Sequence, residues 1–304
     1  MKAIITGSNG LLGSALKKSL GPNHIYHTRK DAELLNFSST IEFFNKNKDA
    51  DTLIHCAARV GGVQANMNDN LGFFHDNFII NNYVTDFAMR NNIKNYVNIL
   101  STCVFPQNPT YPLTSDQIDN GVPHPSNHGY SYAKRLAYYT TKYTREVTGK
   151  NWISIIPTNL YGPNDNFNLE NSHLVPALIR KAYEASLSGE DFVVWGDGTP
   201  LRQFVHSEDM AKIILWAIDN WKSDKPLMAI NETEYSIKEI ALIIASHFNI
   251  PDHRIVFDAS KPNGQFRKPA KSDIPAGVIK FKTIEEGLDE TIEWFIANYD
   301  KIRK

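Results

Sequence analysis

The first twenty residues carry the feature that most constrains the fold. An apolar run at residues 3–6 leads directly into the segment Gly-Ser-Asn-Gly-Leu-Leu-Gly at residues 7–13, and then into a stretch with apolar positions at helical spacing. A strand, a glycine-rich turn and a helix in this order are typical of a dinucleotide-binding start, because the glycines let the backbone approach a pyrophosphate. The spacing is G-x-x-G-x-x-G rather than G-x-G-x-x-G. We therefore predict a Rossmann-type fold; an ordinary glycine-rich turn is the alternative.

The chain goes on alternating apolar runs and helical stretches to about residue 160. Strands are expected near 24–27, 52–55, 96–100 and 152–156, and helices near 40–46, 73–92 and 130–147. This order predicts an α/β fold with a doubly wound parallel sheet. We expect residues 1–160 to form the nucleotide-binding domain, with 203–222 returning to it through a strand at Val205-His206. Residues 161–202 and 223–304 are expected to form a smaller mixed α/β substrate lobe.

The residues after the second apolar run bear on the choice of cofactor. Enzymes specific for NAD often have an acidic residue about twenty residues after the glycines, where it binds the ribose 2′-hydroxyl. Here Arg29 and Lys30 come before Asp31. Two cations suit a 2′-phosphate, and Arg29 is the better candidate because its planar fork can pair with phosphate through two hydrogen bonds. The pattern favours NADP, with solvated loop charges as the alternative.

A Tyr-x-x-x-Lys pair lies near the middle of the chain, at Tyr130 and Lys134. Residues four apart lie on one face of a helix, and an ammonium near a phenol favours the phenolate, so the pair could exchange a proton at neutral pH. Helices carry such pairs by chance, so this one gains its weight from its surroundings. Ser101 follows an apolar run and is expected at the carboxyl edge of the sheet, where ligands bind.

Composition narrows the class of protein. The 304 residues have a formal net charge of −1 and no long basic run, which argues against nucleic-acid binding. Two cysteines give no disulfide framework and fit a reducing compartment. No apolar stretch approaches the ~18 residues of a membrane span, and the first strand leaves no room for a signal peptide. We expect a cytoplasmic protein with no membrane partner and, because the histidines lack ligand spacing, no metal site.

Together, the glycine-rich turn, Ser101 and the Tyr130–Lys134 pair resemble the extended short-chain dehydrogenase/reductase family. In that family the serine holds the substrate carbonyl or hydroxyl and the tyrosine exchanges the proton. The lysine lowers the pKa of the tyrosine and binds the nicotinamide ribose. The resemblance implies these catalytic roles for Ser101, Tyr130 and Lys134.

Longer stretches make the resemblance more specific. Several stretches are similar to the GDP-L-fucose synthase family. They are residues 60–66, 157–167, 170–173, 176–178, 194–204 and 261–264. The similarity extends over about residues 3–268. It implies an NADPH-dependent enzyme that epimerises a GDP-sugar, GDP-4-keto-6-deoxy-D-mannose, at C3 and C5 and reduces it at C4. The family also implies a homodimer formed through the helices near 73–92 and 130–147.

The same resemblance assigns further site residues. Cys103 matches the family's base and His173 its acid, and a thiol and an imidazole both exchange protons near neutrality. Without the resemblance, Cys103 would be taken for a small buried side chain and His173 for a neighbour of a helix cap or a surface residue. The implied cofactor-binding positions are Gly7, Asn9, Gly10, Leu11, Leu12, Gly13, Arg29, Lys30, Ala57, Leu100, Lys134, Pro157, Asn159, Leu160 and His173.

The GDP moiety is expected to contact the second half of the chain. By resemblance, Trp195 stacks on guanine, Arg202 pairs with phosphate and Asn159 contacts the substrate. Lys181 stands where the family usually has an arginine, and it keeps the charge without the bidentate fork. Asn263 stands where the family has an aspartate.

Two other functions remain open at this point. A relative could reduce only C4, on another GDP-4-keto sugar such as a heptose, with Cys103 and His173 idle. A catalytically silent NADP-binding regulator on this fold is the second alternative, although the intact set of Ser101, Tyr130 and Lys134 argues against it.

Overall fold

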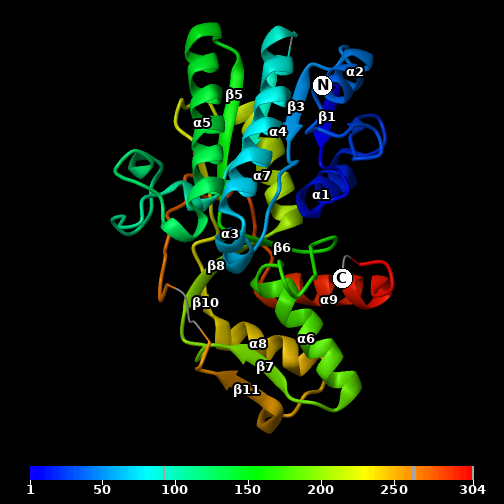
Figure 1. The fold of residues 1–304 in the computed structure, drawn as a ribbon, viewed down its shortest axis with the longest axis vertical. Helices are drawn as coiled ribbons and strands as arrows, with labels where there is room; N and C mark the ends of the chain where they lie inside the picture. Colours follow the sequence, from blue (N-terminus) through cyan, green and yellow to red (C-terminus); the bar gives the residue numbers. More distant parts are fainter. Residues whose placement is uncertain (92, 262–264, 303–304) are drawn as a thin grey trace.

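The main sheet lies in the upper half of the molecule (Figure 1). The computed structural model describes residues 1–304 except 92, 262–264 and 303–304. The sheet has six parallel strands in the order β2-β1-β3-β4-β5-β9. In that order they are Ile25–Tyr26, Ala3–Thr6, Thr52–His55, Asn95–Ile99, Asn151–Pro157 and Leu227–Ala229. The predicted α/β class and doubly wound parallel sheet are confirmed.

Helices cover both faces of this sheet, which is why its strands are apolar along their length. Leu16 of α1 and Ile214 of α7 pack on one face, and Phe44 of α2 and Phe87 of α4 pack on the other. The helices that cover the sheet are α1 Leu11–Leu20, α7 Ser207–Asn220, α2 Phe37–Lys46, α4 Asn70–Arg90 and α5 His128–Thr148. A short helix, α3 Val63–Asn68, precedes α4.

A second lobe lies below the sheet (Figure 1). Its own core includes Phe167, Ile240 and Phe295. Its helices are α6 Leu174–Ser188, α8 Ile237–His247 and α9 Ile284–Asn298. Strands β10 Glu234–Ser236, β8 Leu201–His206 and β6 Asn159–Tyr161 form one small sheet, and β11 Ile255–Asp258 pairs with β7 Phe192–Trp195. Among the described residues, no helix is both long and apolar enough to cross a membrane.

The expected return of Val205-His206 to the main sheet is wrong. Their strand, β8, pairs with β6 and β10 instead. The edge beside β5 is taken by β9, through the register of Ile155 with Leu227. Helix α7, which follows β8, nevertheless packs against the main sheet.

The segment between Cys103 and Tyr130 is largely irregular, as expected. Its regular pieces are short 3-10 turns at Thr102–Val104, Ser115–Gln117 and Pro125–Asn127. A fourth turn, Asp252–Arg254, lies in the second lobe.

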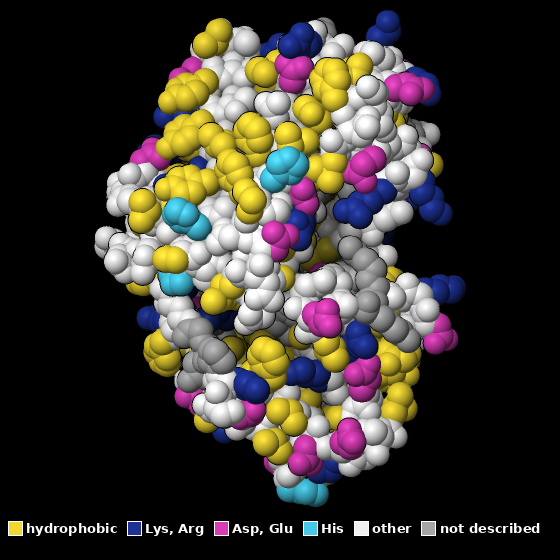
Figure 2. Space-filling model, in the orientation of Figure 1, with side chains coloured by type: hydrophobic (Ala, Val, Ile, Leu, Met, Phe, Trp, Pro, Cys, Tyr) yellow, Lys and Arg dark blue, Asp and Glu magenta, His cyan; other side chains and the backbone are white. Residues whose placement is uncertain are grey.

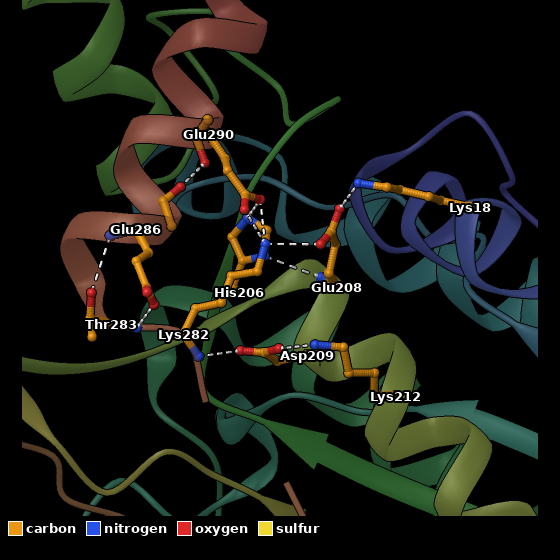
Figure 3. Close-up of polar contacts among 11 residues, drawn as sticks. Lys18, His206, Glu208, Asp209, Lys212, Lys282, Thr283, Glu286 and Glu290 are labelled. Atoms are coloured by element: carbon orange, nitrogen blue, oxygen red, sulfur yellow. Dashed lines mark hydrogen bonds and ion pairs between the residues drawn. The ribbon is translucent and has the colours of Figure 1, made fainter. Parts of the chain in front are cut away.

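A charged cluster joins the two lobes (Figure 3). The Lys282 ammonium donates to Glu208 Oε2 at 2.9 Å and also pairs with the Glu290 carboxylate of α9. The Lys282 backbone N–H donates to Asp209 Oδ2 at 2.7 Å, and Lys18 of α1 pairs with Glu208 from the other side. One lysine therefore ties the first turn of α7 to the helix that packs in the second lobe.

The protonation states in this cluster follow from burial and pairing. Burial opposes the charge on Glu208, but hydrogen bonds from Lys18 and Lys282 outweigh it and lower the pKa of Glu208 to about 2. Burial, reinforced by the charge of Lys282, lowers the pKa of the His206 imidazole. The ligand atoms of His206, Glu208 and Glu290 lie within 4.8 Å of one another, but the Lys282 ammonium already pairs with both carboxylates.

We expect Lys282→Met to lower the free energy of unfolding at pH 7 by about 2 kcal/mol, because it removes the cation that pairs with Glu290 and one of the two that pair with Glu208. The lowered pKa of Glu208 means that its contribution is complete above the ordinary glutamate range and is lost as the pH falls toward 2. The decrease in unfolding free energy caused by Lys282→Met should therefore be smaller at pH 3 than at pH 7. Thermal unfolding at both pH values, with the exposed Lys280→Met as control, measures it. An equal loss at both values would contradict the pairing.

Candidate active site

The glycine-rich turn forms a tight cradle at the amino end of α1. Gly7 has a φ of 67°, in the left-handed region that favours glycine. A Cβ on Gly13 would lie 2.3 Å from the Gly7 carbonyl oxygen, and the Gly10 N–H donates to that same oxygen at 3.0 Å. Between these glycines Asn9 is exposed, while Leu11 and Leu12 begin the helix. A cradle that side chains would fill fits the pyrophosphate of a dinucleotide.

The loop after β2 lies beside this cradle, because the Ser8 N–H donates to the His27 carbonyl at 3.0 Å. Asp31 accepts hydrogen bonds from the Thr28 N–H and hydroxyl, both at 2.7 Å, and these bonds lower the pKa of Asp31. The Asp31 carboxylate therefore stabilises the conformation of this loop. Arg29 and Lys30 remain exposed.

The other expected cofactor positions follow the carboxyl ends of neighbouring strands. Ala57 follows β3, and its N–H donates to Thr6 Oγ1 at 3.1 Å. Leu100 follows β4, and its N–H donates to the β5 carbonyl of Ile155 at 2.8 Å. The last three lie where β5 passes into β6: Pro157, Asn159 and Leu160.

The Tyr130–Lys134 pair occupies one face of α5, as its spacing predicts. The Lys134 nitrogen lies 5.8 Å from the centre of the Tyr130 ring. It also donates to the Ile99 carbonyl at 2.8 Å, at the end of β4. Ser101 follows two residues later, so the structure brings all three expected residues to the end of one strand.

The pKa of the tyrosine does not shift as expected. Burial, reinforced by Cys103, raises the pKa of the Tyr130 phenol, and burial lowers the pKa of Lys134 to about 8. Loss of solvation dominates this shift, so the net lowering of the tyrosine pKa that we expected from Lys134 is not found. Tyr130 is protonated at neutral pH, which suits a proton donor.

Cys103 lies in the 3-10 turn Thr102–Val104 that follows Ser101. The Cys103 backbone N–H donates to Ser101 Oγ at 3.3 Å, which holds the Ser101 side chain against the backbone of this turn. Asn127 Nδ2 lies at hydrogen-bond distance, 2.9 Å, from the Cys103 sulfur. The Lys268 ammonium donates to the Thr102 carbonyl at 3.0 Å.

Sequence reasoning missed Asn127 and Lys268. Burial lowers the pKa of Lys268, and the charge of Cys103 opposes this shift. The same cation lies near Arg202, which links this part of the site to the second lobe. The position of Asn127, three residues before Tyr130, was the available signal. No sequence signal pointed to Lys268, because it lies 166 residues from its partner Thr102.

His173 precedes α6 and occupies its N-cap position. Its pKa is lowered by burial, although part of the residue is exposed. The Gly62 N–H donates to the Asn171 carbonyl at 3.1 Å, which fixes the loop after β3 against this segment. Within the described part of the chain, no hydrogen bond joins His173 to Cys103, which lies on a different element. Figure 2 shows the surface hollowed between the two lobes.

The expected GDP-binding residues fall into two groups. Lys181 and Trp195 are neighbours, with the ammonium 4.8 Å from the ring centre and the indole 54% exposed. Burial lowers the pKa of Lys181. Arg202 is separate from this pair and donates to the Leu201 carbonyl at 2.7 Å. Asn263 lies outside the described residues.

Comparison with known proteins agrees with this geometry. The model of the NAD dependent epimerase/dehydratase family matches residues 3–231. A probable GDP-L-fucose synthase of Drosophila melanogaster is 38% identical, covering 100% of this chain and 99% of that protein. The GDP-L-fucose synthase of Dictyostelium discoideum is 37% identical, covering 99% and 97%.

A solved structure is equally similar. The crystal structure of a GDP-L-fucose synthetase from Naegleria fowleri bound to NADP has a TM-score of 0.91 and 36% identity, covering 99% of this chain and 94% of that one. The resemblance expected from the sequence is confirmed. The chain belongs to the NAD dependent epimerase/dehydratase family, and its similarity to the GDP-L-fucose synthases extends over its full length.

Proposed function

We propose that the protein is an NADPH-dependent enzyme that epimerises GDP-4-keto-6-deoxy-D-mannose at C3 and C5 and reduces it at C4, giving GDP-L-fucose. One observation carries this proposal beyond the similarity. The turn that contains Ser101 and Cys103 lies at the end of β4, where Lys134 of α5 is bound to the Ile99 carbonyl. Groups suited to both proton exchange and reduction therefore share one edge of the sheet.

We propose that the cradle of Gly7, Gly10 and Gly13 holds the pyrophosphate of NADPH, which supplies a hydride to C4 when it is bound. The exposed Arg29 and Lys30 suit the 2′-phosphate, and the solved relative was obtained with NADP.

In the reduction, we propose that the Ser101 hydroxyl binds the C4 oxygen. Tyr130, which is protonated at neutral pH, gives its proton to that oxygen as the ketone becomes an alcohol. Lys134, with a pKa of about 8, stays mostly charged at neutral pH and offsets developing negative charge on the phenol.

In the epimerisation, the C4 ketone acidifies the protons on C3 and C5. We propose that Cys103 removes each proton from one face and that His173 returns a proton to the other. The two residues come from separate elements, as action on opposite faces requires. Burial lowers the pKa of His173, which makes the imidazolium a stronger acid and also leaves it the minor form at neutral pH.

The second lobe suits the rest of the substrate. The exposed Trp195 ring is available for stacking on guanine, and Lys181 and Arg202 supply charge for the diphosphate. Asn159 and Asn263 are proposed to contact the substrate through hydrogen bonds. We propose that residues 1–160 with α7 form the nucleotide domain and that the rest form the substrate lobe, except β9, which lies in the main sheet.

Tyr130→Phe should reduce NADPH oxidation at least ~100-fold, because the proton donor for C4 is lost. Deuterium exchange from solvent into C3 and C5 of the 4-keto sugar should continue. Tyr132→Phe, two residues along the same helix, is the control.

Cys103→Ser should affect the epimerisation instead, so deuterium exchange at C3 and C5 should slow while cofactor binding is retained. Exchange at an unchanged rate in Cys103→Ser would favour an enzyme that reduces only C4.

Arg29→Ala should weaken NADPH binding about tenfold and NADH binding little, since only NADPH carries the 2′-phosphate. The change is measured as dissociation constants for both nucleotides, with Lys48→Ala as an exposed control. Equal losses of affinity for NADPH and NADH would mean that Arg29 does not bind the 2′-phosphate and is only a solvated charge of the loop.

We also propose that the protein is a homodimer formed through the outer faces of α4 and α5. Figure 2 shows hydrophobic side chains gathered over these helices. A contiguous exposed apolar surface of this kind is typical of an interface. Its exposed members include Leu71, Phe78, Leu136, Tyr143 and Val147.

Leu136→Glu should shift the protein from dimer to monomer, because it places a charge within this face. Sedimentation velocity measures the change, and Leu187→Glu on α6, another exposed leucine, is the control. A Leu136→Glu protein with unchanged mass would exclude this interface.

A further inference from the structure

Asn127 stands at the N-cap position of α5 but does not cap it. Asparagine is favoured at this position because its side-chain oxygen accepts a hydrogen bond from the N2 or N3 amide. Asn36 does so at α2, where Oδ1 accepts from the Ser39 N–H at 2.9 Å. Asn127 makes no such bond. Its Nδ2 lies 2.9 Å from the Cys103 sulfur instead.

The orientation of the Asn127 amide is fixed by Ser131, one turn further along α5. The fully buried Ser131 hydroxyl donates to the backbone carbonyl of Asn127 at 2.8 Å. The same hydroxyl lies 3.3 Å from the side-chain oxygen, Oδ1, of Asn127. This contact keeps the amide oxygen on the hydroxyl side and directs the N–H group at the sulfur. An N–H donor favours a negatively charged sulfur over a neutral thiol.

Other charged and titratable groups surround the turn without replacing this contact. The Lys268 ammonium is bound to the Thr102 carbonyl, and Arg135 Nε donates to the Val104 carbonyl at 2.7 Å. Tyr130 is close enough for Cys103 to raise its pKa further. The two cations hold the backbone of the turn, whereas Asn127 reaches the sulfur itself.

We propose that Asn127 is a positioning residue for epimerisation, whose amide N–H holds the Cys103 sulfur in place and stabilises the thiolate when it forms. The sulfur takes the carbon-bound proton from C3 or C5, becomes a thiol, and returns the proton to solvent between steps. The proposal rests on the proposed function. It also fits the absence of the Asn127 side chain from the cap of α5, where Asn70 Oδ1 accepts from the Gly129 N–H instead.

The decisive variant is Asn127→Asp. Aspartate is as good an N-cap as asparagine, so the start of α5 is preserved, but it has no N–H and brings a like charge to the sulfur. We expect deuterium exchange at C3 and C5 to fall at least ~10-fold in Asn127→Asp and in Asn127→Ala, with NADPH affinity unchanged. Exchange at the unsubstituted rate in Asn127→Asp would show that epimerisation does not need the Asn127 N–H, and would overturn the proposal.

A second measurement needs no substrate. The rate of alkylation by iodoacetamide as a function of pH reports formation of the Cys103 thiolate, with Cys103→Ser as the blank. Burial raises the pKa of the Cys56 thiol to about 12, so that thiol stays silent near neutrality. We expect the alkylation midpoint to rise by about one pH unit in Asn127→Ala and Asn127→Asp.

The two readouts separate the possible failures. Midpoints that do not move would overturn the proposal even if the unsubstituted protein exchanges deuterium. A moved midpoint in a protein that exchanges no deuterium would overturn the role in epimerisation together with the proposed function, while leaving the contact between Asn127 and sulfur intact.

Discussion

Buried cations bound to backbone carbonyl oxygens hold the end of β4, and the candidate site depends on this anchoring. A charged side chain loses solvation on burial, and a bond to a carbonyl offsets part of that loss. Each bond fixes one point of the segment that contains Ser101 and Cys103. The turn is therefore set against α5 and the second lobe together. The three contacts are Lys134 with Ile99, Lys268 with Thr102 and Arg135 with Val104.

This anchoring places the groups proposed for the reduction and for the epimerisation in one site. Burial keeps the Tyr130 phenol protonated, as a proton donor requires. Burial lowers the pKa of Lys134 only to about 8, so its ammonium stays mostly charged at neutral pH and can support the donor. The cysteine lies on the same turn as the serine, so one fixed segment can serve both the epimerisation and the reduction. The second lobe supplies the remaining contacts, and Lys282 links it to α7 close to the sheet.

Local spacing made much of this architecture predictable. The glycine-rich turn and the Tyr130–Lys134 pair depend on contacts between residues a few positions apart, and the structure places them as expected. Long-range contacts were not predictable. Lys268 binds Thr102, which lies 166 residues away in the sequence. Strand β8 pairs with β6 and β10, and β9 occupies the edge of the main sheet beside β5. The Tyr130 pKa was misjudged because burial cannot be read from a four-residue spacing. The individual catalytic roles remain predictions.

The central claim is that one site both inverts two carbons and reduces a third. The most direct test is to incubate the unsubstituted protein with NADPH and GDP-4-keto-6-deoxy-D-mannose in deuterium oxide and to identify the product by NMR. The account predicts GDP-L-fucose with deuterium at C3 and C5. A product reduced at C4 that retains protium at both neighbouring carbons would contradict it, and would leave an enzyme that only reduces.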